Sequence, residues 1–240
     1  MTAVEIIEEL RQLSDPAKLM DLDRYAIKTP KAFGIRAPEL KAFAREVKKL
    51  VADRHAAAQE LWQSGIYDAR AVAFLIDDPK KVTSAQMDAW ATDFDNWATV
   101  DGACSYLFCR TPFAYEKAYE WAGREREFEK RAAFSLMAYL AVHDKKAPNE
   151  SLVAFLPVIE AHADDDRNFV KKAINWALRQ IGKRNLALNS LAIETAERIK
   201  LQNTKPARWI AADVLRELRS PQVLARLLEK EEKRPQRGRG

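Results

Sequence analysis

One short pattern recurs where helices are predicted to begin: an aromatic residue, two variable positions, a basic residue and an alanine. Copies begin at Tyr67, Phe128 and Phe169, and a degraded copy begins at Trp209. The copies at Phe128 and Phe169 are 41 residues apart, and the earlier interval of 61 residues accommodates two shorter units. A unit of about 40 residues that recurs in this way predicts stacked pairs of helices.

The segments between these copies are also amphipathic, and their short connections carry Pro, Gly, Asp or Asn. We expect helices at residues 3–12, 16–28, 38–51, 54–64, 68–77, 83–94, 97–109, 113–122, 126–142, 150–161, 167–182, 186–200, 205–218 and 221–230. The pattern indicates an all-α, HEAT-like or armadillo-like α-α solenoid of paired antiparallel helices. If the helices alternate between two layers, one layer forms a concave basic face from residues 68–77, 97–109, 126–142, 167–182 and 205–218.

No long linker interrupts the helices, so residues 1–230 are predicted to form a single HEAT-like repeat domain. Residues 231–240 are predicted to be a basic, disordered tail, which either contacts phosphates or remains a solvated end. The net charge of +5 permits a polyanionic partner without requiring one.

The composition excludes several classes of function. The seven glycines do not cluster, which excludes a phosphate-binding loop or a dinucleotide fingerprint. Cys104 and Cys109 are spaced neither as a redox pair nor as a zinc knuckle, and we expect reduced core thiols. Three scattered histidines indicate no metal site, and the acidic N-terminus is unlike a signal peptide. We expect no cofactor, no membrane contact, and a monomer in a bacterial-type cytoplasm, associated with the nucleoid.

A tryptophan lies on the polar side of the helix predicted at 167–182. At about 100° per residue, the apolar stripe of this helix consists of Val170, Ala173, Ile174, Ala177, Leu178 and Ile181. The opposite side carries Lys172, Trp176 and Arg179. A large aromatic side chain between two cations, outside a complete apolar stripe, favours a flat or anionic partner such as nucleic acid.

A second tryptophan is one helical turn from an acid. Trp97 and Asp101 project from the same face of their predicted helix, which continues with apolar side chains. Trp97 alone would more often be a core residue, and Asp101 alone would be an N-cap if the helix began later. Arg131 alone would be a solvated feature of the repeat. Together with Trp176, these residues favour a functional site.

Four segments, in order along the chain, resemble the AlkD family of DNA alkylation repair enzymes: residues 25–38, 96–101, 128–134 and 169–179. The resemblance extends from about residue 5 to residue 220 and includes the Gly-Ile-x-x-Pro element at 34–38. It implies a HEAT-like fold and a monofunctional DNA glycosylase, which hydrolyses the N-glycosidic bond of N3- and N7-alkylated purines in duplex DNA for base excision repair. Asn96 and Ala98 depart from the family pattern, which often has an aromatic residue and an acid there.

By this resemblance, Asp101 corresponds to the catalytic acid, Trp97 and Trp176 to aromatic walls, Arg131 to the site arginine, and Tyr25 to a tyrosine that contacts the DNA backbone. Further phosphate contacts are predicted at Lys172, Arg179, Lys183, Arg70 and Arg208. Two other functions remain open from the sequence: a non-catalytic HEAT-like protein that binds branched or distorted DNA, and a protein-binding scaffold.

Overall fold

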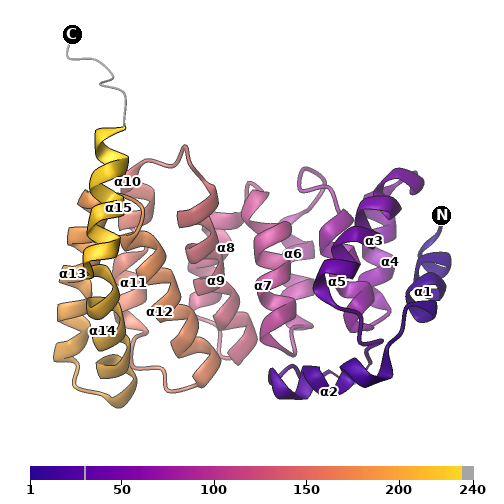
Figure 1. The fold of residues 1–240 in the computed structure, drawn as a ribbon, viewed down its shortest axis with the longest axis horizontal. Helices are drawn as coiled ribbons and strands as arrows, with labels where there is room; N and C mark the ends of the chain where they lie inside the picture. The colour runs from indigo at the N-terminus through magenta and orange to yellow at the C-terminus, as the bar shows by residue number, and fades with distance from the viewer. Residues whose placement is uncertain (30, 234–240) are drawn as a thin grey trace, which may run out of the picture. The chain divides into compact units, whose positions relative to one another are not determined.

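The computed structural model describes residues 1–29 and 31–233, and this part of the chain is helical without a β-strand. The all-α prediction is confirmed. The chain divides into two compact units, Met1–Lys117 (unit 1) and Ala118–Gly240 (unit 2), with the boundary inside a helix (Figure 1). The single domain over residues 1–230 stays a prediction.

Unit 1 consists of short helices with conventional caps. Asp15, Asp53 and Thr83 accept hydrogen bonds from the first turns of three of them, which satisfies backbone donors that a helix leaves free. The helices are α1 (Ala3–Gln12), α2 (Pro16–Arg24), α3 (Ala37–Leu50), α4 (Arg54–Gln63), α5 (Tyr67–Ile76), α6 (Ser84–Thr92), α7 (Trp97–Tyr106) and the 3-10 helix η1 (Phe108–Arg110). Helix α8 (Ala114–Ala122) carries the boundary between the units. Helix α2 buries none of its residues and lies at the edge of unit 1 (Figure 1).

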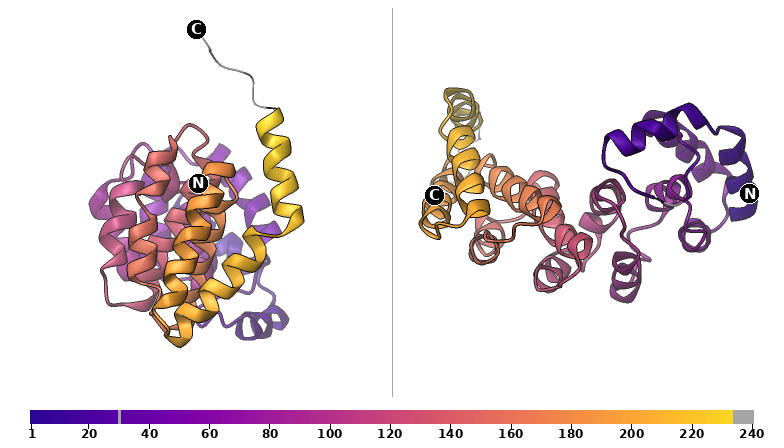
Figure 2. Two further views of the ribbon diagram at one scale, coloured as in Figure 1. Left: turned by 90° about the vertical axis from the view of Figure 1, so that its left-hand side faces the viewer. Right: turned by 90° about the horizontal axis from the view of Figure 1, so that it is seen from below.

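Unit 2 contains the longer helices. They are α9 (Glu127–His143), α10 (Asn149–Val153), α11 (Leu156–Ala161), α12 (Asn168–Gly182), α13 (Leu186–Leu201), α14 (Lys205–Leu218) and α15 (Pro221–Glu232). Helix α15 leaves α14 after a bend at Ser220, as both views in Figure 2 show. It extends to Glu232, so the predicted start of a disordered tail at residue 231 is wrong by two residues. The rest of the predicted tail, residues 234–240, lies outside the described part of the chain.

The helix boundaries agree with the sequence prediction to within a few residues, with three exceptions. Helix α2 stops at Arg24 because Ala26 has a left-handed backbone (φ +54°) that cannot continue it. Residues 97–109 form α7 and then η1, since Leu107 leaves helical geometry. Residues 150–161 form two helices because Pro157 has no N–H to donate to the preceding turn.

Helices predicted to share a layer are neighbours within each unit. In unit 1, α5 packs against α7; in unit 2, α12 packs against both α9 and α14 (Figures 1 and 2). All six residues of the predicted apolar stripe of α12 are buried. The pairing of helices into layers is therefore confirmed inside each unit.

Candidate nucleic-acid interface

The start of α7 is fixed by a buried asparagine. The Asn96 side-chain oxygen accepts from the backbone N–H of Thr99 at 2.9 Å, and its amide nitrogen donates to Asp95 Oδ1 at 2.7 Å. Asn96 is therefore the N-cap, and the helix begins at Trp97. The alternative interpretation of Asp101 as an N-cap is wrong, because Asp101 lies one turn inside the helix and is partly exposed.

Trp97 is also only partly buried, so it is not a core residue of unit 1. Its indole Nε1 donates to the backbone carbonyl of Tyr25 at 2.9 Å. Tyr25 follows α2 and is 60% exposed. The structure thus brings Tyr25, Trp97 and Asp101 together in unit 1, and we call these three residues the α7 cluster.

A buried carboxylate holds the segment that follows Tyr25. Asp68 accepts from the backbone N–H of Phe33 at 2.6 Å and from that of Ile35 at 3.1 Å. Burial raises the pKa of Asp68, and these backbone hydrogen bonds oppose that effect. Gly34, which lies between Phe33 and Ile35, has a φ of +79°, and a β-carbon on it would overlap the backbone carbonyl of Asp15. The Gly-Ile-x-x-Pro element is therefore a structural turn, and Asp68 is a residue that the sequence analysis missed.

Helix α7 approaches α5 closely beneath the α7 cluster. A β-carbon on Gly102 would overlap the ring of Phe74, which stacks on Tyr106 with ring centroids 6.1 Å apart. Gly102 follows Asp101 directly, so this contact fixes the rotation and depth of the helix at the candidate acid.

The arginines of the repeat are tied to backbone carbonyls. In unit 2, Arg131 is 7% exposed, and its Nη1 donates to the carbonyl of Phe169 at 2.8 Å. In unit 1, Arg70 donates to the carbonyl of Asp93 at 3.1 Å and lies 5.0 Å from the ring centre of Trp62. The alternative of a solvated repeat arginine is wrong for Arg131, since this side chain joins α9 to the start of α12.

Trp176 is partly buried on the polar side of α12, as predicted. Its ring meets Tyr139 edge to face, with centroids 4.8 Å apart. One turn earlier, Lys172 is exposed, and within residues 1–29 and 31–233 no ion pair or hydrogen bond is found for its ammonium group. Trp176 therefore has a fixed orientation beside an unpaired cation.

The next two cations of α12 are paired with acids of α14. Lys183 Nζ lies 2.7 Å from Glu217 Oε1, and Arg179 hydrogen bonds the other oxygen of Glu217 and lies 3.6 Å from Asp213. Burial raises the pKa of Glu217, but the hydrogen bonds from Lys183 and Arg179 outweigh it and lower the pKa overall. We call Lys172, Trp176, Arg179 and Lys183 the α12 face.

Two further residues of unit 2 lie at the start of α14. Arg208 is exposed and donates to the Asn203 carbonyl at 2.8 Å, which supports the turn before the helix. Trp209 is 42% exposed, and Lys171 Nζ lies 5.1 Å from its ring centre. Trp209 was not predicted as a site residue, although the degraded repeat copy places an aromatic residue at that position.

The predicted residues therefore form two groups, one in each unit. Whether the α7 cluster and the α12 face act on one DNA site stays a prediction, as do the individual DNA contacts. Neither Cys104 nor Cys109 forms a disulfide, and Cys104 is buried while Cys109 is partly buried. In the described ranges, no three His, Cys, Asp or Glu side chains are grouped to hold a metal ion. None of the described helices combines the length and apolar character needed to span a bilayer.

The fold matches a solved structure described as "A new family of proteins related to the HEAT-like repeat DNA glycosylases with affinity for branched DNA structures". The TM-score is 0.73 at 20% sequence identity, over 90% of this chain and 95% of that chain. The protein thus has a HEAT-like repeat fold. The chain belongs to the DNA alkylation repair enzyme family, whose sequence pattern matches residues 6–230. No curated protein is significantly similar in sequence.

Proposed function

We propose that the protein is a DNA glycosylase that removes cationic N3- and N7-alkylated purines, such as 3-methyladenine and 7-methylguanine, from duplex DNA. The observation that carries this proposal is the geometry of α7, which presents Trp97 and Asp101 one turn apart on a partly exposed surface. Asn96 caps the helix, so Asp101 is not its N-cap. Membership of the DNA alkylation repair family supports the same activity.

The substrate determines what the site must supply. An alkylated purine carries a positive charge, so the base departs with the electron pair of the C1′–N bond and needs little general-acid help. Positive charge then develops on the deoxyribose, as in other glycoside hydrolysis. Water forms the new bond to C1′, and its proton passes to solvent or to the carboxylate. Stabilisation of the sugar cation is the main catalytic demand.

We assign this role to the carboxylate of Asp101. The indole ring of Trp97, fixed by its bond to the Tyr25 carbonyl, would exclude water and offer a π face to the cation. Trp176, on the α12 face of unit 2, would offer a further π face to DNA. Arg131 is buried, so we expect it to act on DNA chiefly by holding the start of α12, which carries Lys172 and Trp176.

The decisive experiment is release of 7-methylguanine from methylated duplex DNA by the wild type and by Asp101→Asn. We expect the excision rate to fall at least about 100-fold, because loss of one electrostatic group at a developing charge costs about 3–4 kcal/mol. Duplex binding should stay within about twofold, since a carboxylate facing DNA contributes no attraction to phosphates. Asp53→Asn is the matched control, because it also removes a carboxylate from unit 1 and asparagine still caps α4. Excision that survives in Asp101→Asn would refute the assignment.

A second candidate function is non-catalytic binding of branched DNA, favoured by the description of the structurally similar protein. It predicts no base release from any methylated duplex and tighter binding to a four-way junction than to a duplex of equal length. If the protein is instead a protein-binding scaffold, it should bind neither the junction nor the duplex in moderate salt. Binding titrations with the two DNA forms would show this.

A further inference from the structure

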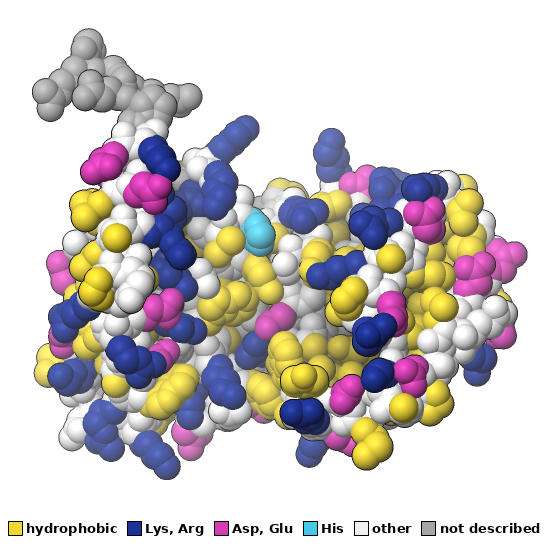
Figure 3. All heavy atoms as spheres, in the orientation of Figure 1, with side chains coloured by type: hydrophobic (Ala, Val, Ile, Leu, Met, Phe, Trp, Pro, Cys, Tyr) yellow, Lys and Arg dark blue, Asp and Glu magenta, His cyan; other side chains and the backbone are white. Residues whose placement is uncertain are grey.

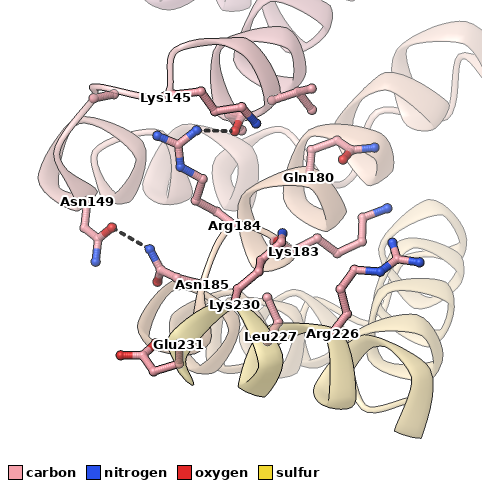
Figure 4. Close-up of a pocket in the computed structure, with 13 residues that line it drawn as sticks. Lys145, Asn149, Gln180, Lys183, Arg184, Asn185, Arg226, Leu227, Lys230 and Glu231 are labelled. Carbon is pink, nitrogen blue, oxygen red and sulfur yellow. Dashed lines mark hydrogen bonds between the residues drawn. The ribbon is translucent and has the colours of Figure 1, made fainter. Parts of the chain in front are cut away.

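A basic pocket lies in unit 2 at the C-terminal ends of α9 and α12, where α15 closes one side (Figure 4). Its volume is about 510 Å³. Its lining carries one carboxylate, Glu231, and five cations: Lys145, Lys183, Arg184, Arg226 and Lys230. Of these cations, Lys183 is also paired with Glu217 of α14. Figure 3 shows Lys and Arg side chains gathered beside α15. Of these residues, only Lys183 is predicted from the sequence to contact phosphates.

Two of the cations are held by neutral partners. Arg184 donates to the carbonyls of Ala141 at 3.0 Å and Asp144 at 2.6 Å, at the end of α9. Lys230 Nζ donates to the carbonyl of Lys183 at 3.2 Å. Carbonyl oxygens at helix ends carry only partial negative charge. These contacts therefore fix the two side chains in position while most of their positive charge remains.

Two other cations are exposed at the rim of the pocket. For Lys145 and Arg226, no acidic partner is found among the residues that the structure describes. Figure 4 shows the carboxylate of Glu231 on the opposite side from the guanidinium of Arg226. Burial, followed by the charges of Lys145 and Arg226, lowers the pKa of Lys230. Crowded like charges oppose folding, and an anionic ligand would relieve this cost.

We propose that this pocket binds phosphate groups, and that their source is the backbone of DNA beyond the segment held by Lys172. The inference rests on the proposed DNA role of the protein. Lys172 lies on α12 and Lys183 is its C-cap, eleven residues later and therefore about 16 Å away along the helix axis. Because one DNA strand carries a phosphate about every 3.4 Å of its axis, a strand along α12 would present several phosphates between them. A pocket of this volume that is open at the surface suits a passing strand better than one small ion.

The test uses Lys145→Gln/Arg226→Gln, which removes two exposed cations without disturbing the bonds of Arg184. Binding to a duplex of 30 base pairs is measured as a function of salt concentration. We expect the slope of log affinity against log salt to become about two units shallower, since each phosphate contact contributes about 0.9. Arg198→Gln/Lys200→Gln removes two exposed cations of α13 and should leave the slope unchanged.

A second arm distinguishes DNA from free phosphate. The thermal midpoint of the DNA-free protein is measured with inorganic phosphate for the wild type, the pocket variant and the α13 control. A shallower salt slope of the pocket variant in DNA binding supports the DNA backbone as the source of the phosphates. If inorganic phosphate raises the thermal midpoint of the wild type and not that of the pocket variant, free phosphate is supported instead. If the pocket variant behaves as the α13 control in both measurements, the proposal is refuted. Base release by the wild type is assayed separately, so failure of the proposed glycosylase activity is recognised independently.

Discussion

The α7 cluster of unit 1 and the α12 face of unit 2 are built by different interactions. The α7 cluster is positioned by a buried N-cap, by an indole bond to a backbone carbonyl and by close packing at Gly102. On the α12 face, Arg179 and Lys183 are positioned by ion pairs with Glu217. The first kind of support is insensitive to salt. The second weakens as salt screens the charges, although less than for fully exposed pairs because these side chains are partly buried.

This difference separates the tasks that the two surfaces can perform. Catalysis requires an acid held within fractions of an ångström, which the close packing of α7 at Gly102 can supply. Electrostatic binding of DNA requires cations that can exchange partners. Arg179 and Lys183 can bind phosphates only in competition with Glu217, whereas Lys172 is available without such competition.

Disturbing the packing beneath Asp101 should have the largest effect. Gly102→Ala places a methyl group against Phe74 and should push α7 away from α5. We expect a loss of about 1–3 kcal/mol in the free energy of unfolding, as for other overpacked sites. Excision should fall by up to about 100-fold, because a displacement of about 1 Å has effects of that size. Urea denaturation and single-turnover base release measure the two effects.

Gly123→Ala is the matched control for this experiment. A β-carbon at Gly123 would meet its nearest neighbour, the carbonyl of Glu120, at an ordinary 3.7 Å. Stability and excision should therefore stay near those of the wild type. If Gly102→Ala resembles Gly123→Ala in both assays, close packing does not position the candidate acid.

Glu217 is the acid that holds two cations of the α12 face. Glu217→Gln removes the charge that Arg179 and Lys183 share, so both should become available to DNA. We expect duplex affinity to rise about two- to fivefold, the size of a single surface ion pair. The salt slope between about 50 and 200 mM should become steeper. Glu197→Gln breaks the ion pair between Glu197 of α13 and Arg219, the C-cap of α14. This control should change neither the duplex affinity nor the salt slope.

The same variant has a readout that needs no DNA. Because the folded-state pKa of Glu217 is lowered, its ionised form stabilises the fold above the unfolded pKa of about 4.3. This contribution is lost as pH falls through the lower folded-state value. The acid-induced loss of stability below about pH 4 should therefore be smaller in Glu217→Gln than in the wild type. Identical acid transitions and unchanged DNA affinity would show that Glu217 does not control these cations.

Periodicity in the sequence predicted the helices. The complete apolar stripe of α12 predicted that Trp176 lies on the opposite, polar side of this helix. Both depend on local spacing, which a sequence displays directly. The role of Glu217 depends on contacts with residues 34 and 38 positions away, and no local pattern encodes such a pairing. The burial of Arg131 was missed for the same reason, because its partner is the carbonyl of Phe169 on another helix. The turn at Gly34 was recognised only as a motif, since its acceptor, Asp68, lies on α5.

The smallest expected effect distinguishes two cations of the α12 face. From the sequence, Lys172 and Arg179 are equivalent, and each should contribute about one unit to the salt slope. In the structure, Lys172 is exposed and Arg179 is held by Glu217 and Asp213. Lys172→Gln should therefore reduce the slope by about one unit, and Arg179→Gln by less, because Arg179 must first leave its acids. In a Glu217→Gln background, the effect of Arg179→Gln should approach that of Lys172→Gln. Equal effects of the two substitutions in the wild-type background would show that the ion pairs of α14 place no restraint on DNA binding.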